Sequence, residues 1–194
     1  MRDQALCLFS GRRVRDWSVL DRGESDNSHK NSPYVLPYPV GKTYMCSQGR
    51  FTGGHNRGRI QYAQDFAMPL RSVVTAARAG RVFHKRENVP ENTGSDTVVN
   101  EVILFQEDGS YAIYVHLGTN GVFVEVGQSV LQGDTLAVTG NTGNVGPVPH
   151  LHFHVTRDRP TLGIQARTIP VLFKNTKPHP NGVVTGEYYT AEPY

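Results

Sequence analysis

The chain has 194 residues, of which 38% are hydrophobic and 19% are charged, and its formal net charge at pH 7 is +3. This length and composition fit one globular domain with a core of its own, and the 20 glycines and 12 prolines argue against a helical bundle. The mild positive charge is compatible with a polyanionic partner such as a cell wall. The sequence contains no clustered stripe of Lys and Arg, which argues against a nucleic-acid partner. It also contains no run of about 18 apolar residues, so no membrane span is predicted.

The first 32 residues are polar and weakly patterned, and we interpret residues 1–32 as an N-terminal arm. It contains no basic segment followed by an apolar one, so no secretion signal is expected in the chain as given. One of the two cysteines, Cys7, lies in this arm, and the other, Cys46, follows it. Two cysteines without C-x-x-C spacing make neither a disulfide framework nor a zinc knuckle, and the sequence leaves both a pair and two free thiols open.

Residues 33–173 carry short runs of β-branched and aromatic residues, broken by Gly, Pro and Asn. Many short strands with turn signals between them predict an all-β domain with antiparallel sheets. The predicted strands are 43–47, 61–67, 73–77, 80–85, 98–106, 111–117, 122–126, 135–139 and 150–156. The remaining residues, 174–194, are rich in Pro and Gly and predict an irregular C-terminal tail.

Two loops between the predicted strands stand out, and residues 86–97 have a length that is often found in functional walls or lids. Residues 86–97 are polar, although a plain surface excursion explains them as well. Residues 139–149 are rich in Gly and lead straight into His150, and Gly permits unusual backbone angles and close approach to a neighbour.

The strongest local signal is the run His-Leu-His-Phe-His-Val at residues 150–155. Side chains alternate between the faces of a strand, so His150, His152 and His154 share one face and the apolar residues share the other, which is the core face. A polar row facing solvent is one interpretation, but Thr or Lys would be commoner there. A metal site explains more, because alternate residues of a strand lie about 6.6 Å apart. One histidine can then ligate a metal while the next approaches the water that the metal activates.

Catalytic zinc usually takes three protein ligands from His, Asp, Glu and Cys and keeps a fourth position for water. The thiols offer no ligand spacing, which leaves histidines and carboxylates. The candidates outside the histidine strand are His55, Asp65, His84 and His116. Each of them taken alone is more often an ordinary surface residue than a ligand.

Asp65 and His116 have informative surroundings. Asp65 is a carboxylate within the otherwise apolar predicted strand 61–67, where a strand-end aspartate that caps a turn is the simpler alternative. His116 lies near the end of the predicted strand 111–117, where alternation places it on one face with Ala112 and Tyr114. A histidine that is merely hydrogen-bonded at a strand end is the alternative there.

Seven segments follow one another in an order that resembles the motif series of the lysostaphin-type zinc endopeptidases. Each segment alone is a weak signal, but the ordered set is highly specific and covers residues 33–155. The segments are Gly54-His55, 62–69 (Tyr-Ala-Gln-Asp-Phe-Ala-Met-Pro), 76–82, 114–117 (Tyr-Val-His-Leu), 126–134, 140–143 (Gly-Asn-Thr-Gly) and 150–153 (His-Leu-His-Phe).

The resemblance implies a lysostaphin-like, barrel-sandwich-hybrid fold and one zinc ion. By position in the motifs, His55, Asp65 and His152 match the family's ligands, and His116 and His150 match the two histidines that assist the zinc-bound water. The implied reaction is endopeptidic hydrolysis in the stem or cross-bridge peptides of bacterial peptidoglycan. The implied location is periplasmic or extracellular, although a chain without a secretion signal leaves the cytoplasm open, and we expect a monomer.

Three positions depart from the family's usual pattern. His55 and Asp65 are ten positions apart instead of four, as in variant members with the same run around Asp65. His154 stands where many members carry an acidic residue, and its role is left open. Arg71 replaces a usual Gly in the turn after Met68-Pro69, so the geometry of that turn is expected to differ.

Two other functions deserve comparison with the peptidase. A carrier or phosphotransfer module of related β architecture would explain residues 126–136, but no modifiable lysine occupies a matching hairpin tip. A catalytically inactive scaffold that binds or activates another enzyme usually loses metal ligands, whereas suitable residue types occupy all five positions here. A zinc assay separates the scaffold from the enzyme.

Overall fold

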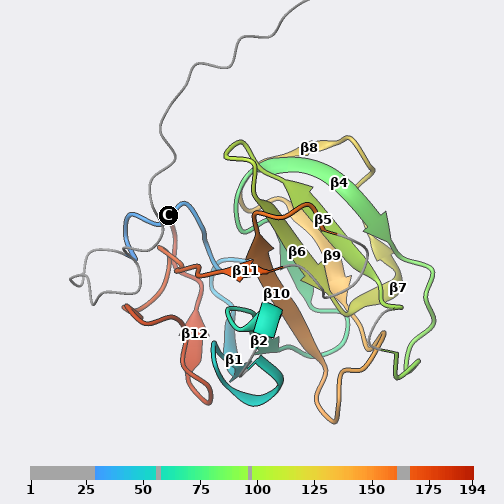
Figure 1. Ribbon diagram of the computed structural model, residues 1–194, viewed down its shortest axis with the longest axis horizontal. Helices are drawn as coiled ribbons and strands as arrows, with labels where there is room; N and C mark the ends of the chain where they lie inside the picture. Colours follow the sequence, from blue (N-terminus) through green and yellow to red (C-terminus); the bar gives the residue numbers. More distant parts are fainter. Residues whose placement is uncertain (1–28, 56–57, 96–97, 161–166) are drawn as a thin grey trace, which may run out of the picture.

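The computed structural model describes residues 29–55, 58–95, 98–160 and 167–194. They form strands and two 3-10 turns, and no α-helix occurs among these residues (Figure 1). The 3-10 turns are η2 (Gly53–His55) and η3 (Gly58–Ile60). The strands are β1 (Thr43–Gln48), β2 (Gln64–Ala67), β3 (Val73–Thr75), β4 (Gly80–Arg86), β5 (Glu101–Phe105), β6 (Tyr111–Val115), β7 (Leu117–Val122), β8 (Ser129–Val130), β9 (Thr135–Thr139), β10 (His150–Thr156), β11 (Thr168–Ile169) and β12 (Tyr188–Thr190).

The strands make two antiparallel sheets that share one core. The larger sheet has nine strands in the order β12-β1-β2-β10-β6-β5-β4-β8, with β11 attached to β10, and the smaller has the order β3-β9-β7. Side chains of both sheets join in one buried cluster, to which β10 contributes Phe153 and β9 contributes Leu136. In the view of Figure 1 the small sheet lies behind the large one. The predicted all-β fold with antiparallel sheets is therefore confirmed.

The two faces of β10 have the chemistry that alternation predicts. Leu151, Phe153 and Val155 are fully buried in the shared core. The three histidines of the strand project from the opposite face, which is covered in turn, so that all seven residues of β10 are buried. A row of histidines on a buried face argues against the interpretation as a solvent-facing polar row.

The strands differ from their predicted bounds where the backbone turns. The predicted strand 111–117 is divided into β6 and β7, because His116 between them adopts the left-handed conformation, with φ of 64°. The predicted strand 122–126 is wrong except for its first residue, which ends β7. The predicted strand 61–67 begins only at Gln64, after η3 and a turn.

The C-terminal segment contains more regular structure than an irregular tail. Its strand β12 pairs antiparallel with β1, and Tyr189 and Val183 belong to the shared core. Cys46 on β1 is a buried free thiol, whereas Cys7 lies outside the described residues, as does most of the arm 1–32. No helix in the described part of the chain is long and apolar enough to cross a membrane.

Candidate metal centre

Strand pairing brings Asp65 and His152 together. In the antiparallel pair of β2 and β10 the two residues lie directly opposite each other, so their side chains leave the sheet on one face. Nδ1 of His152 lies 2.8 Å from Oδ1 of Asp65, and both side chains are buried. The contact between these two groups is therefore a consequence of sheet register.

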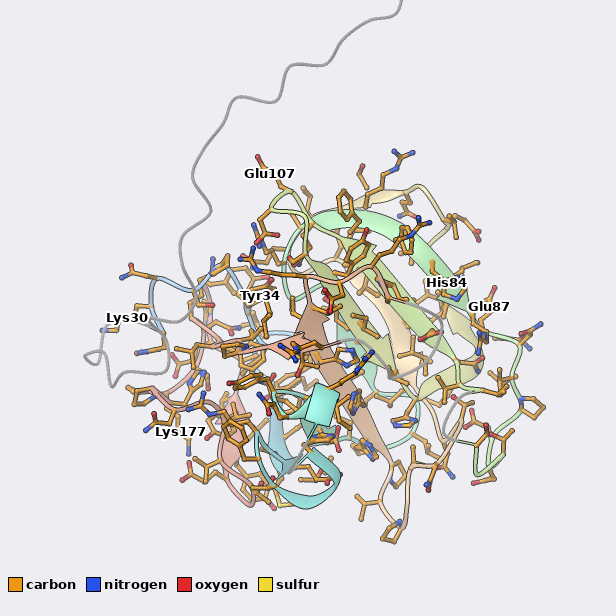
Figure 2. The ribbon with its side chains drawn as sticks, viewed as in Figure 1. Lys30, Tyr34, His84, Glu87, Glu107 and Lys177 are labelled. Carbon is orange, nitrogen blue, oxygen red and sulfur yellow. The ribbon has the colours of Figure 1, made fainter. Side chains whose placement is uncertain are left out.

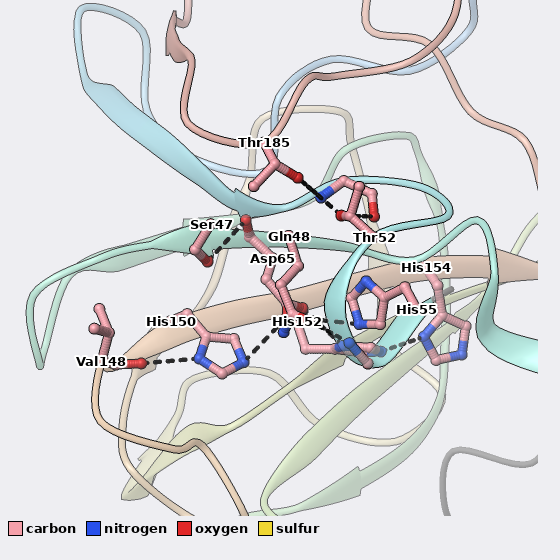
Figure 3. A network of polar contacts seen from close by, with 12 residues as sticks. Ser47, Gln48, Thr52, His55, Asp65, Val148, His150, His152, His154 and Thr185 are labelled. Carbon is pink, nitrogen blue, oxygen red and sulfur yellow. Dashed lines mark hydrogen bonds and ion pairs between the residues drawn. The ribbon is translucent and has the colours of Figure 1, made fainter. Parts of the chain in front are cut away.

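His55 reaches the same point from η2, on the loop between β1 and β2. Its Nε2 lies 3.5 Å from Oδ2 of Asp65, and its ring centroid lies 5.1 Å from that of His152 (Figure 3). One ligand atom from each of these three residues lies within 4.8 Å of the others. The spacing of ten positions is thus compatible with convergence of His55 and Asp65.

This donor set fits zinc. Two imidazoles and one carboxylate, all buried, are a combination that catalytic zinc uses when it keeps a further position for water. Burial lowers the pKa of His55, which keeps its ring neutral, as a metal ligand must be. Among the described residues His84 is not part of the cluster. It lies on β4, labelled in Figure 2, with its Nε2 3.7 Å from Oε1 of Glu101.

His150 and His116 flank this cluster. Nε2 of His150 lies 3.6 Å from Oδ2 of Asp65, and the ring centroid of His116 lies 4.8 Å from that of His150. Nδ1 of each ring faces a backbone carbonyl, that of Val148 for His150 (3.0 Å) and that of Thr142 for His116 (2.8 Å). A carbonyl only accepts, so in each neutral ring Nδ1 carries the hydrogen and Nε2 keeps the lone pair.

The left-handed backbone of His116 decides which way its ring points. Simple alternation would place it with Ala112 and Tyr114, and both of these belong to the shared core. Instead the ring lies beside His150 and, at 6.0 Å between centroids, His152. A non-glycine residue with positive φ costs energy and tends to persist at functional sites. The predicted face of His116 is therefore wrong, although the structure places the residue beside the candidate ligands.

The charges of the cluster are set by burial and by the neighbouring rings. Burial alone would raise the pKa of Asp65, but His152, His150 and His55 outweigh it and lower the pKa to about 2. Burial, followed by the proximity of His150 and His152, lowers the pKa of His116 to about 3. At neutral pH the centre therefore combines an ionised carboxylate with a neutral His116.

Two further residues complete the cluster. His154 lies behind His152, with its Nδ1 3.0 Å from Nε2 of His152, and burial lowers its pKa well below the ordinary value. Gln48 contacts Asp65 from β1, with its Nε2 2.6 Å from Oδ2 (Figure 3). Sequence patterns did not identify Gln48, because the predicted strand ended one residue before it. Asp65 therefore has a polar partner on each neighbouring strand, Gln48 on β1 and His152 on β10.

Comparison with known proteins finds matches that cover more than half of the chain. The model of the family described as Peptidase family M23 matches residues 59–163, which include Asp65, His116, His150 and His152 but begin after His55. An uncharacterized metalloprotease of Buchnera aphidicola subsp. Baizongia pistaciae is 25% identical over 159 residues, 78% of this chain and 39% of its own length. The peptidoglycan DD-endopeptidase ShyB of Vibrio cholerae serotype O1 is 30% identical over 139 residues, 66% of this chain and 29% of its own. The chain thus spans well under half the length of these curated relatives.

Solved structures share the fold. The catalytic domain of the prophage-encoded M23 protein EnpA from Enterococcus faecalis has a TM-score of 0.52 at 16% identity, over 69% of this chain and 93% of that one. The deep-sea M23 metalloprotease pseudoalterin also has a TM-score of 0.52, at 15% identity, over 76% of this chain and 81% of that one. At such low identity the likeness concerns the arrangement of the strands alone.

Proposed function

Since the chain belongs to peptidase family M23, we propose that it is a zinc-dependent metalloendopeptidase that hydrolyses stem or cross-bridge peptides of bacterial peptidoglycan. The observation that carries the proposal is the convergence of His55, Asp65 and His152 within 4.8 Å. The name of the relative ShyB, a peptidoglycan DD-endopeptidase, supports the substrate class. That substrate would place the enzyme in the periplasm or outside the cell.

Three side chains would hold the metal. The structure directs Nε2 of His55, the carboxylate of Asp65 and Nδ1 of His152 towards one another, and each is a donor that zinc accepts. Zinc in such a site supplies a Lewis acid that polarises a carbonyl and makes water a nucleophile near neutral pH. The negative charge of Asp65, kept by its lowered pKa, favours a cation at this point.

His150 and His116 would move the protons. Both rings have their Nδ1–H bonded to a backbone carbonyl, which leaves Nε2 as the atom that accepts a proton from the attacking water. A ring that has gained a proton can return it to the leaving amine or stabilise the oxyanion. The division of these tasks between the two histidines is part of the proposal. Neither step requires a glutamate base.

The test is digestion of purified peptidoglycans of different cross-link types, with the products identified by mass spectrometry. We expect about one zinc per chain, new amino and carboxyl ends at one type of bond, loss of activity with a chelator and recovery with zinc. The variant His152→Ala serves as the matched control that lacks a ligand. Bound zinc without cleavage of any peptidoglycan would favour an inactive binding scaffold, and a protein that takes up no zinc would overturn the metal site.

A further inference from the structure

Gln48 links two parts of the candidate metal centre, the carboxylate of Asp65 on β2 and the loop that carries His55. We propose that Gln48 is a positioning residue, whose side-chain amide ties the carboxylate of Asp65 to the loop that carries His55. This inference rests on the proposed function, because it assigns a role towards the same metal. Gln48 would act through the two ligands, by its contacts with Asp65 and with the N–H of Gly54.

Both polar atoms of the Gln48 amide are used. Nε2 donates to Oδ2 of Asp65 at 2.6 Å, and Oε1 accepts from the backbone N–H of Gly54 at 2.6 Å. Turning the amide over would set its oxygen against a carboxylate and its NH₂ against an N–H. The two partners therefore fix the orientation of the amide, and the amide fixes the distance between them.

The loop is built around this side chain. Gly53, with φ of 52°, lies so close that a Cβ added there would be 2.0 Å from Oε1 of Gln48. The residue after Gly54 is His55, whose own N–H donates to the carbonyl of Thr52, the residue before η2. An anchor on Gly54 thus lies one residue from the candidate ligand. The hydrogen bond between Gly54 and Gln48 offsets part of the entropic cost of holding the loop, and with it His55, in one conformation.

An irregularity in β1 aims Gln48 at the centre. Cys46 and Gln48 are two positions apart, so in a regular strand their side chains would lie on the same face. Cys46 is buried in the shared core, whereas Gln48 contacts Asp65 in the candidate metal centre. The pairing of β1 with β2 shifts register between these two residues and places Gln48 opposite Asp65. Bulges of this kind re-aim a side chain and are common next to functional sites.

The bridge determines how Asp65 presents its oxygens. Gln48 occupies one lone pair of Oδ2, while Oδ1 faces Nδ1 of His152. Both oxygens of the carboxylate therefore have a partner, and the contact from Gln48 restricts its rotation. Residues that orient metal ligands in this manner typically contribute about 10–100-fold to metal affinity.

The experiment compares zinc affinity in two matched variants. Gln48→Met keeps the length of the side chain and removes both hydrogen bonds. Gln132→Met removes an amide that also makes two hydrogen bonds, to the carbonyls of Pro33 (2.7 Å) and Ala77 (2.8 Å), but lies on the turn between β8 and β9. Zinc affinity is measured by competition with a chromophoric chelator, and unfolding of the metal-free proteins shows whether each variant folds.

We expect about 10–100-fold weaker zinc binding for Gln48→Met and wild-type affinity for Gln132→Met. Equal affinity in Gln48→Met and the wild type would overturn the role of Gln48, and so would equal weakening in both variants. If Gln48→Met does not fold, Gln48→Asn replaces it, because its amide is one methylene too short to reach both partners and should also weaken binding. A wild-type protein without zinc affinity would instead overturn the proposed function.

Discussion

Nε2 of His152 lies 3.0 Å from Nδ1 of His154, and both rings are buried. In a neutral His152 ring whose Nδ1 donates to the ionised Asp65, Nε2 keeps the lone pair and accepts from Nδ1 of His154. In the proposed site a metal on Nδ1 of His152 would reverse this arrangement, because Nε2 would then carry the hydrogen and donate to His154. An imidazole at position 154 can serve both states, since it donates as well as accepts.

This relationship predicts different effects for two nearly isosteric substitutions. His154→Asn keeps a group that can accept from or donate to Nε2 of His152, and we expect zinc affinity within a fewfold of wild type. His154→Leu removes that group and should weaken zinc binding by about tenfold or more. The measurement is the same chelator competition, with unfolding curves of both metal-free variants as the control for folding. Equal affinities for the Asn and Leu variants would show that the hydrogen bond does not matter.

His116 should be needed for turnover and dispensable for zinc. His116→Asn suits the position, because Asn tolerates the left-handed backbone at φ of 64°, and it removes the proton acceptor. We expect kcat/KM to fall by about 10²–10⁴-fold while the zinc content stays the same. His152→Ala, by contrast, should lose both zinc and activity. Full turnover in His116→Asn would remove this residue from the mechanism.

Two neighbouring tyrosines on β12 should differ sharply in their contribution to stability. Tyr189 is 1% exposed, and its hydroxyl accepts from the N–H of Val184 at 2.8 Å, whereas Tyr188 is 63% exposed. Tyr189→Ala should lower the free energy of unfolding by roughly 3–5 kcal/mol, and Tyr188→Ala should change it by less than about 0.5 kcal/mol. Chemical denaturation measures both. Similar small effects would mean that β12 is peripheral.

Acid should destabilise the metal-free protein partly through His179, which lies away from the metal centre. Burial lowers the pKa of His179 from 6.5, an effect only partly opposed by its hydrogen bond to the carbonyl of Lys177. The unfolded chain then binds more protons than the folded one, so the stability present above about pH 6.5 falls as the pH falls towards the folded pKa.

The test compares urea midpoints at about pH 7.5 and about pH 5.5, with a chelator present, for the wild type and His179→Gln. The variant loses one titrating group, so its midpoint should change less with pH, even if it is lower throughout. His55, His116 and His154 also have lowered pKa values and leave a residual slope. An unchanged slope in the variant would contradict the contribution of His179.

The sequence by itself determined the features that depend on local periodicity. The alternation in residues 150–156 separates a histidine face from a core face, and β10 shows that separation. Short apolar runs between turn residues predicted the all-β fold, since a strand's period of two is a property of the strand alone. The residue types around Asp65 and His152 were enough to indicate a metal site and a family.

Only the tertiary structure decided how these residues meet. The approach of His55 to Asp65 depends on a loop held by Gln48, and Gln48 points there because β1 shifts register against β2. The ring of His116 leaves its expected face because one backbone angle turns it towards His150. The contribution of Tyr189 comes from a pairing of β12 with β1 across most of the chain. Bulges, left-handed residues and long-range pairings are stabilised by distant partners, and those partners leave no periodic signal in the sequence around them.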